Sequence, residues 1–185
     1  MRIIAGKYRG RRLASLRGQR LRPTSDRVRE AIFSILGNDL SGTRVLDLFA
    51  GTGAMGLEAL SRGAALVVLV DQHSAALRLI ARNAAALGAS EQVTVKKLDL
   101  VRGLRGLARE GWEFDLIFVD PPYHLGLGEV CLQDLGRGTL LAPRAVVVSE
   151  QAVDEYLAPA YGCLQLQDVR RYGSTAVGFY RREQK

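Results

Sequence analysis

A short apolar run that leads into a glycine-rich loop constrains the fold of this chain more than any other feature. Residues 45–49 read VLDLF, and residues 50–56 read AGTGAMG. Apolar residues then recur at helical spacing, beginning at Leu57 and Leu60. This order of buried strand, tight turn and helix is typical of an α/β domain. Ligands of such domains bind beyond the carboxyl ends of the strands, so we expect a binding site at this loop.

The glycine loop alone leaves two kinds of ligand open. Its spacing also fits the dinucleotide pattern G-x-G-x-x-G, and a second apolar run, residues 66–70, ends in Asp71, twenty residues after Gly51. An acidic residue at this place hydrogen-bonds ribose hydroxyls in either an NAD site or an adenosyl site. Asp47, at the end of the first strand, favours a ligand with an amino group or positive charge over a pyrophosphate. This predicts S-adenosylmethionine, although Asp47 is also suited to capping the backbone N–H groups of the loop.

A second site signal follows another apolar run, residues 114–119, which read FDLIFV. The next four residues are Asp120, Pro121, Pro122 and Tyr123. The two prolines cannot continue a strand and hold the backbone extended, which leaves a carboxylate and carbonyl oxygens at the strand end. Such acceptors suit an exocyclic amine of a nucleobase, which gains positive charge as it is methylated. The alternative is a plain turn that ends the strand.

These segments together resemble the amino-group methyltransferases of the class I Rossmann-like type, whose signature after the fourth strand is [D/N/S]-P-P-[Y/F/W]. Residues 1–13 and 21–36 are similar to the RsmD family of bacterial 16S rRNA guanine-N2 methyltransferases. One departure is the Asp-Gln-His at residues 71–73, where a longer Glu is expected. The shorter side chain preserves a ribose contact with less reach.

The resemblance implies a set of site residues. The catalytic residues are expected to be Asp120, Pro121, Pro122 and Tyr123. The cofactor-binding residues are expected to be Asp47, Phe49, Gly51, Thr52, Gly53, Asp71, Gln72, Asp99 and Leu100. In this class an acid at the position of Asp99 commonly receives the adenine amino group, and capping of a helix is the competing interpretation. The same signature also serves adenine-N6 and cytosine-N4 enzymes acting on DNA or RNA, so the target base depends on the family resemblance.

Positive charge is concentrated at the amino terminus. Residues 1–29 contain ten Lys/Arg and one acid, a charge of +9, so the other 156 residues carry −2 of the net +7. A basic segment on a slightly acidic body is typical of nucleic-acid binding. The residues expected to contact RNA are Arg2, Lys7, Arg9, Arg11, Arg12, Arg17, Arg20, Arg22 and Arg27. Interleaved apolar residues and two glycines favour a folded β-hairpin over a solvated tail.

The remaining pattern completes the predicted fold: a class I methyltransferase domain with a seven-stranded, mostly parallel sheet and an antiparallel C-terminal pair. Residues 1–40 are expected to form a basic hairpin and helix, and residues 41–185 the catalytic domain. Further elements are predicted as helices at 24–36, 74–87, 101–109 and 127–135, and strands at 93–97, 145–149, 163–169 and 175–180. The first of these helices is expected to be capped by Thr24 or Ser25 and to bury Val28, Ala31, Ile32, Ile35 and Leu36.

Other classes are disfavoured by composition. No run approaches eighteen apolar residues, and residues 1–4 lack a long apolar segment, so we expect a cytoplasmic, single-domain enzyme without a membrane partner. Cys131 and Cys163 are expected to be reduced core thiols, and two scattered histidines predict no metal site. We expect a monomer that acts on 16S rRNA or the small ribosomal subunit. A non-catalytic RNA-binding assembly factor is the alternative from another class.

Overall fold

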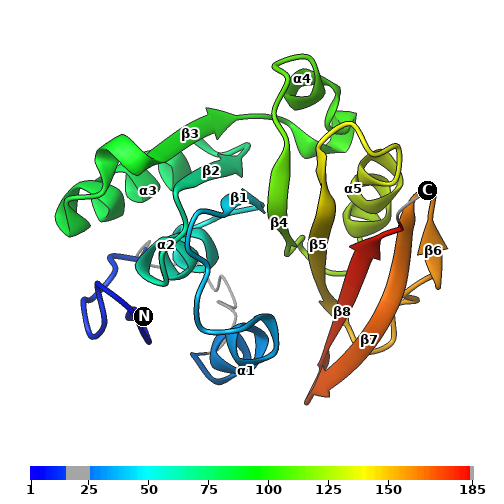
Figure 1. The fold of residues 1–185 in the computed structure, drawn as a ribbon, viewed down its shortest axis with the longest axis horizontal. Helices are drawn as coiled ribbons and strands as arrows, with labels where there is room; N and C mark the ends of the chain where they lie inside the picture. The colour runs from blue at the N-terminus through cyan, green and yellow to red at the C-terminus, as the bar shows by residue number, and fades with distance from the viewer. Residues whose placement is uncertain (16–25, 184–185) are drawn as a thin grey trace. The chain divides into compact units, whose positions relative to one another are not determined.

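The computed structural model describes residues 1–15 and 26–183, and the chain divides into two compact units, residues 1–97 and 98–185. Each unit carries part of the strand-and-helix pattern predicted from the sequence (Figure 1). The predicted helix caps Thr24 and Ser25 lie outside the described residues, as do Arg17, Arg20 and Arg22.

The first unit contains three parallel strands in the order β3-β2-β1: β1 (Arg44–Leu48), β2 (Leu66–Asp71) and β3 (Val93–Lys97). Helix α2 (Ala54–Ser61) follows β1, helix α3 (Ser74–Leu87) follows β2, and the 3-10 helix η1 (Ser90–Gln92) precedes β3. The register pairs Leu48 with Val70, so the carboxyl ends of β1 and β2 meet at one edge. This edge places the glycine loop beside the end of β2.

Helix α3 forms as predicted, because alanine and leucine favour helix and its apolar residues share one face. Ala76, Ile80, Ala84 and Leu87 are buried. Gly88 ends the helix in the left-handed conformation at φ 69°, and its N–H donates to the carbonyls of the last turn. One polar residue, Asn83, is also buried on this face.

Helix α1 (Asp26–Leu36) presents a face that differs from the predicted one. Its buried residues are Val28, Arg29, Ile32 and Phe33, whereas Ile35 is 44% exposed. The arginine is buried because its guanidinium lies 3.8 Å from the carboxylate of Glu58, which is also buried. The buried face of α1 therefore includes an ion-paired arginine that the apolar pattern does not reveal.

The amino terminus folds as an antiparallel hairpin, here called the N-terminal hairpin (residues 1–13), rather than as a solvated tail. Arg2 and Arg12 form a bridge, and Ile3 N donates to Arg11 O at 3.0 Å. Ile3, Tyr8 and Leu13 are buried. Gly6 and Gly10 take φ of +80°, as the turns require. In Figure 1 the hairpin is the dark-blue segment beside α2.

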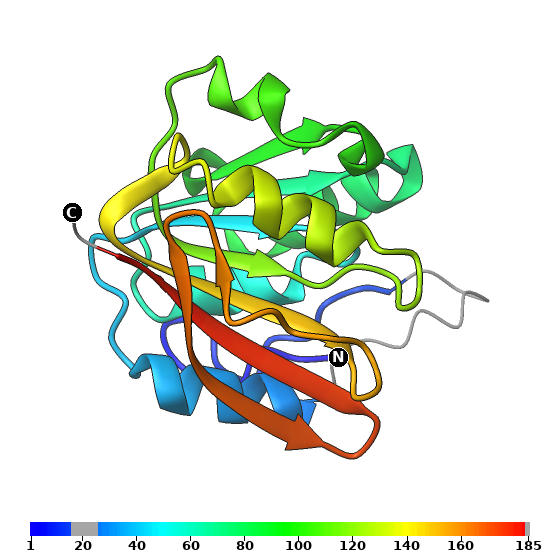
Figure 2. The same ribbon diagram turned by 90° about the vertical axis from the view of Figure 1, so that its right-hand side faces the viewer.

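The second unit contains a mixed set of strands in the order β4-β5-β8-β7-β6 (Figure 2). They are β4 (Phe114–Val119), β5 (Leu141–Ala152), β6 (Ala160–Tyr161), β7 (Leu164–Tyr172) and β8 (Thr175–Arg182). Strands β4 and β5 pair in parallel, and β8 pairs antiparallel with both β5 and β7. The described residues thus hold one strand more than the predicted seven, because the two-residue edge strand β6 has no recognisable pattern.

The helices of the second unit match the prediction only in part. Helix α5 (Leu127–Leu135) has the predicted bounds. The single helix predicted at 101–109 is instead a 3-10 helix η2 (Leu100–Arg102) and a short helix α4 (Arg105–Ala108). Gly103, at φ 77°, separates them. Cys131 is buried and Cys163 half-buried, and neither is in a disulfide.

None of the helices in the described part of the chain is long and apolar enough to cross a membrane.

Candidate functional site

The glycine loop between β1 and α2 runs through several left-handed backbone positions. Phe49 has φ 62°, Gly51 54° and Gly53 78°. A Cβ built on Gly51 would meet nothing nearer than the Phe49 carbonyl oxygen at 3.9 Å, so the space beside this glycine is open to a ligand. A Cβ on Gly56 would lie 2.7 Å from side chains of β2, which confirms that this glycine lets α2 pack tightly on the strand.

Asp47 lies at the end of β1 and is only 2% exposed. Its Oδ2 accepts a hydrogen bond from Gly56 N at 2.9 Å. Burial raises the pKa of this carboxyl to about 7, the hydrogen bond from Gly56 opposes that shift, and the negative charge of Asp71 adds to it. Asp47 therefore fastens the first turn of α2, directly after the loop, to β1, and its contact with a cofactor stays a prediction.

Asp71, at the end of β2, also bonds to backbone around the loop. Its Oδ2 accepts from Gly51 N at 3.0 Å, and its Oδ1 accepts from His73 N at 2.8 Å. The His73 ring nitrogen Nδ1 lies 3.1 Å from the same Oδ1. A carboxylate has about four acceptor positions, so these bonds leave room for a ribose hydroxyl. Gln72, the neighbouring candidate, is exposed.

Sequence reasoning missed Asn83 of α3. Its Nδ2 donates to Thr52 O at 3.0 Å and to Ala14 O at 3.1 Å, and its Oδ1 accepts from Ala14 N at 2.8 Å. Thr52 is one of the predicted cofactor residues. The signal that marks Asn83 is an amide within the apolar stripe of the helix, since a buried polar group needs partners.

A second missed residue, Glu58 of α2, holds the N-terminal hairpin. Its side chain is fully buried and accepts hydrogen bonds from Ile4 N at 2.7 Å and Ala5 N at 3.0 Å. It also pairs with Arg62 at 2.9 Å. Gly6 lies so close to α2 that a Cβ there would be 1.8 Å from the Ser61 carbonyl oxygen. The hairpin is thereby built into the first unit.

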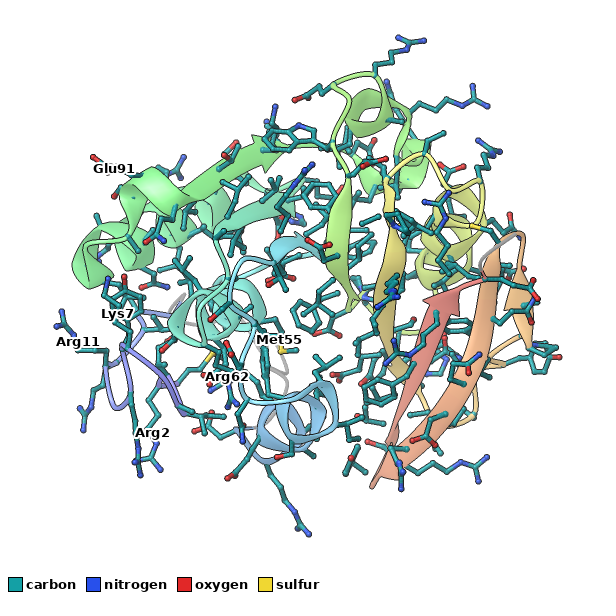
Figure 3. The ribbon with its side chains drawn as sticks, in the orientation of Figure 1. Arg2, Lys7, Arg11, Met55, Arg62 and Glu91 are labelled. Atoms are coloured by element: carbon teal, nitrogen blue, oxygen red, sulfur yellow. The ribbon has the colours of Figure 1, made fainter. Side chains whose placement is uncertain are left out.

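The basic side chains of the hairpin point outward, as nucleic-acid binding requires. Arg2, Lys7 and Arg11 are labelled in Figure 3, and the exposed set among the predicted RNA-binding residues is Arg2, Lys7, Arg9, Arg11, Arg12 and Arg27. The Arg11 guanidinium also donates to Ala86 O at the end of α3, at 2.6 Å. Their contact with RNA stays a prediction.

The predicted catalytic tetrapeptide lies in the second unit, directly after β4. Asp120 is half-buried, Pro121 buried and Pro122 exposed. A Cβ on Gly128, in the first turn of α5, would lie 3.3 Å from the Pro121 ring, so the helix start packs closely on the first proline. This contact and the fixed φ of proline hold the tetrapeptide backbone in place.

Tyr123 is fixed by two strands that lie far from it in the sequence. Its hydroxyl donates to Glu150 Oε1 of β5 at 2.9 Å and lies 2.9 Å from Thr175 Oγ1 of β8. Since the phenol has a single proton, Thr175 donates to Tyr123. Burial raises the pKa of Tyr123, and the nearby negative charge of Glu150 adds to the shift. Glu150 was missed because it lies between two other polar residues, Ser149 and Gln151, after the apolar run 145–148.

Asp99, the predicted adenine contact, caps η2. Its Oδ1 accepts from Val101 N at 3.2 Å, and Arg102 lies 3.4 Å from its Oδ2. The competing interpretation, helix capping, is thus observed, and a contact with adenine stays a prediction. Leu100 is buried. Within residues 1–15 and 26–183, no group of three or more His, Cys, Asp or Glu is arranged to hold a metal ion.

The strands, the glycine loop and the tetrapeptide after β4 define the α/β fold of the class I S-adenosylmethionine-dependent methyltransferases. A solved structure described as a putative methyltransferase yhhF from Escherichia coli has a TM-score of 0.86 and 36% identity, and it covers 100% of this chain and 99% of that one. Residues 1–181 match the family described as Conserved hypothetical protein 95, and the chain belongs to this family.

Curated relatives match over nearly the whole chain. "Ribosomal RNA small subunit methyltransferase D" of Escherichia coli (strain K12) is 36% identical over 99% of this chain and 90% of its own length. "Putative rRNA methyltransferase YlbH" of Bacillus subtilis (strain 168) is 34% identical over 98% of this chain and 99% of its own length.

Proposed function

We propose that this protein transfers a methyl group from S-adenosylmethionine to the exocyclic N2 amine of a guanine in 16S rRNA. The observation that carries the proposal is the tetrapeptide Asp120–Tyr123 at the end of β4, in a chain 36% identical over 99% of its length to a small-subunit rRNA methyltransferase. The cofactor supplies an electrophilic methyl on a sulfonium when bound. The residues of this chain supply the rest.

The first unit provides a place for the cofactor. The space beside Gly51 is open, and two buried carboxylates, Asp47 and Asp71, lie at the ends of adjacent strands. A carboxylate whose pKa is raised by burial gains from a nearby cation, which suits the amino-acid tail of the cofactor. Asp71 and Gln72 would accept hydrogen bonds from the ribose hydroxyls. We propose Asp99 and Leu100, which belong to the second unit, as the residues that contact the adenine.

The second unit provides the groups that act on the target amine. The N2 lone pair of guanine is delocalised into the ring, so attack requires the nitrogen to become pyramidal while positive charge grows on it. Asp120 Oδ and the Pro121 carbonyl would accept hydrogen bonds from the two N–H groups. They would thereby stabilise the positive charge that develops on the nitrogen in the transition state. Tyr123, held by Glu150 and Thr175, would stack on the base.

The basic residues of the N-terminal hairpin support an RNA substrate. Five of them, from Arg2 to Arg12, are exposed on a hairpin whose backbone is fixed by Glu58. Fixed cationic side chains bind the phosphate backbone without reading its sequence. We propose 16S rRNA or the small ribosomal subunit as partner, a monomeric enzyme, and a cytoplasmic location, where ribosomes are assembled.

Transfer of tritium from labelled S-adenosylmethionine tests the proposal. Purified protein is incubated with small ribosomal subunits and with naked 16S rRNA from cells lacking the gene, and the labelled nucleotide is mapped by mass spectrometry. We expect a single N2-methylguanine. Label on adenine or cytosine would overturn the choice of base, and RNA binding without transfer would favour a non-catalytic assembly factor.

A further inference from the structure

The side chain of Asn83 joins two segments of the first unit by hydrogen bonds. Its donors go to the carbonyls of Thr52 and Ala14, and its acceptor receives the N–H of Ala14. The side chain is buried, with the residue only 2% exposed. Asn83 is therefore a fixed connection and not a surface amide.

The two segments belong to different parts of the proposed site. Thr52 lies in the glycine loop, between Gly51 and Gly53, and Ala14 directly follows the N-terminal hairpin. A second contact joins the same parts, because Thr52 Oγ1 donates to Met1 Sδ at 3.5 Å. The loop thus contacts Met1 directly and is joined to Ala14 through the side chain of Asn83. We refer to these contacts as the loop–hairpin link.

The energetics of a buried amide make this link responsive to ligands. If the Thr52 carbonyl shifts, either Asn83 follows it or a buried donor is left without a hydrogen-bond partner, which is unfavourable. If Asn83 follows, its bonds to Ala14 must adjust as well. A ligand that fixes the loop will therefore also favour one position of the hairpin.

We propose that Asn83 is a positioning residue that couples the cofactor loop to the RNA-binding hairpin, so that cofactor and RNA each bind more tightly in the presence of the other. This inference rests on the proposed function of both parts. The coupling is reciprocal, because a ligand that raises the affinity for a second ligand has its own affinity raised by the same factor.

Calorimetric titration of S-adenosylhomocysteine, with and without saturating 16S rRNA transcript, tests the coupling. We expect RNA to raise the affinity of the native protein about fivefold or more, at the lower end of typical allosteric factors. Asn83→Asp keeps the size and the acceptor for Ala14 N but loses both donors. For this variant the ratio of the affinity for S-adenosylhomocysteine with RNA to the affinity without RNA should fall close to one. A ratio of one in the native protein, or an unchanged ratio in Asn83→Asp, would overturn the inference.

Asn38→Ala is the matched control. Asn38 Oδ1 accepts from Arg62 at 2.8 Å, so this variant also breaks a bond made by an asparagine side chain, but none to the loop. We expect it to keep the native ratio, and loss of the ratio in this control would overturn the assignment to Asn83. If the native protein fails to bind S-adenosylhomocysteine at all, the proposed function falls together with the inference; binding without coupling removes the inference alone.

A measurement on the native protein alone covers the case in which Asn83→Asp does not fold. S-adenosylhomocysteine should slow hydrogen exchange at the Ala14 amide, which donates to Asn83. It should leave the Tyr8 amide unchanged, because that N–H donates to Ser61 Oγ at 2.9 Å, away from the loop. Equal responses at the two amides would overturn the inference.

Discussion

The two compact units hold their parts of the proposed site in different ways. In the first unit, Asp71 accepts a hydrogen bond from Gly51 N in the glycine loop, and Asp47 accepts one from Gly56 N in the first turn of α2, directly after the loop. In the second unit, the tetrapeptide ends in Tyr123, whose hydroxyl bonds to side chains of two other strands. In the first unit, the acids that fix the backbone are also expected to contact the ligand. In the second unit, Tyr123 is held by Glu150 and Thr175, which are not among the expected ligand contacts.

This difference predicts which substitutions affect the chemistry without altering the structure of the site. Changing an acid of the loop alters both the loop and the ligand contact, since one carboxylate serves both. Asp120 is not one of the side chains that hold the Tyr123 hydroxyl, so we expect its substitution to act on the substrate more than on the position of Tyr123.

Asp120→Ala should have the largest effect, lowering the rate of methyl transfer by about 10²–10⁴-fold. The lost carboxylate would have stabilised charge on the amine in the transition state. Single-turnover assays measure the rate, and calorimetry with S-adenosylhomocysteine measures cofactor affinity, which should barely change. An equal loss of cofactor affinity would mean that Asp120 is structural and that the contrast between the units is wrong.

Tyr123→Ala should come second, lowering kcat/KM for RNA by about 5- to 150-fold, because base–aromatic stacking contributes about 1–3 kcal/mol. Tyr123→Phe keeps the ring but loses the bonds to Glu150 and Thr175, so its loss should be smaller. Steady-state kinetics with varied RNA measure both. If the two variants are equally impaired, the hydroxyl and not the ring is what matters.

Asp47→Asn should change how stability depends on pH. The pKa of Asp47 is raised from 3.8 to about 7, so the folded protein holds this proton more tightly than the unfolded chain does. Its contribution to stability is fully present below pH 3.8 and is lost as the pH rises through about 7.

The asparagine keeps an acceptor for Gly56 N and has no proton to lose. We therefore expect Asp47→Asn to gain stability relative to the native protein between pH 4 and 7, by up to about 1.4 kcal/mol per pH unit. Urea unfolding at several pH values measures the difference. If the difference in the free energy of unfolding between Asp47→Asn and the native protein does not vary with pH, burial does not disfavour the ionised form of Asp47.

Charge removal on the hairpin should have the smallest effect. Arg9→Ala or Arg12→Ala should each reduce the slope of log K for RNA against log salt by about 0.7, the value for one phosphate contact with a single strand. Filter binding at several salt concentrations measures the slope. Arg144→Ala, an exposed arginine of the second unit, serves as the control, and an equal change there would argue against a specific role for the hairpin.

Single substitutions are needed because deletion of the hairpin would not isolate its charge. Ile3, Tyr8 and Leu13 are buried, and the Glu58 carboxylate depends on the N–H groups of Ile4 and Ala5. Removal of these partners would leave a buried charge with fewer hydrogen bonds, which is strongly destabilising.

Much of the fold was predictable because local pattern and tertiary structure agree. Helix α5, strand β3 and the end of α3 at Gly88 follow from apolar spacing and a glycine cap. The face of α1 did not follow, because Arg29 is buried through its ion pair with Glu58, a residue 29 positions away. Apolar periodicity does not record such a pair.

The positions of the site motifs at the strand ends could be predicted from the sequence, but the side chains that hold these motifs could not. Asp47, Asp71 and Asp120 stand at the strand ends where the parallel pattern places them. The side chains that hold these motifs, Asn83 and Glu150, come from distant elements, so only the fold reveals their contacts. In the sequence, Asn83 stands out only as a polar residue on the apolar face of its helix, and Glu150 is flanked by the polar residues Ser149 and Gln151.

The pairing of Tyr123 with Thr175 makes the last hairpin of the chain part of the architecture around the catalytic tetrapeptide. Thr175 is the first residue of β8 and pairs with Ala152 of β5, just after the turn at Gly173. Side chains alternate between the faces of a strand, so a slip of β8 by one residue would turn this hydroxyl to the opposite face. An insertion or deletion in that turn, fifty residues downstream, would therefore remove a hydrogen bond that holds the ring of Tyr123.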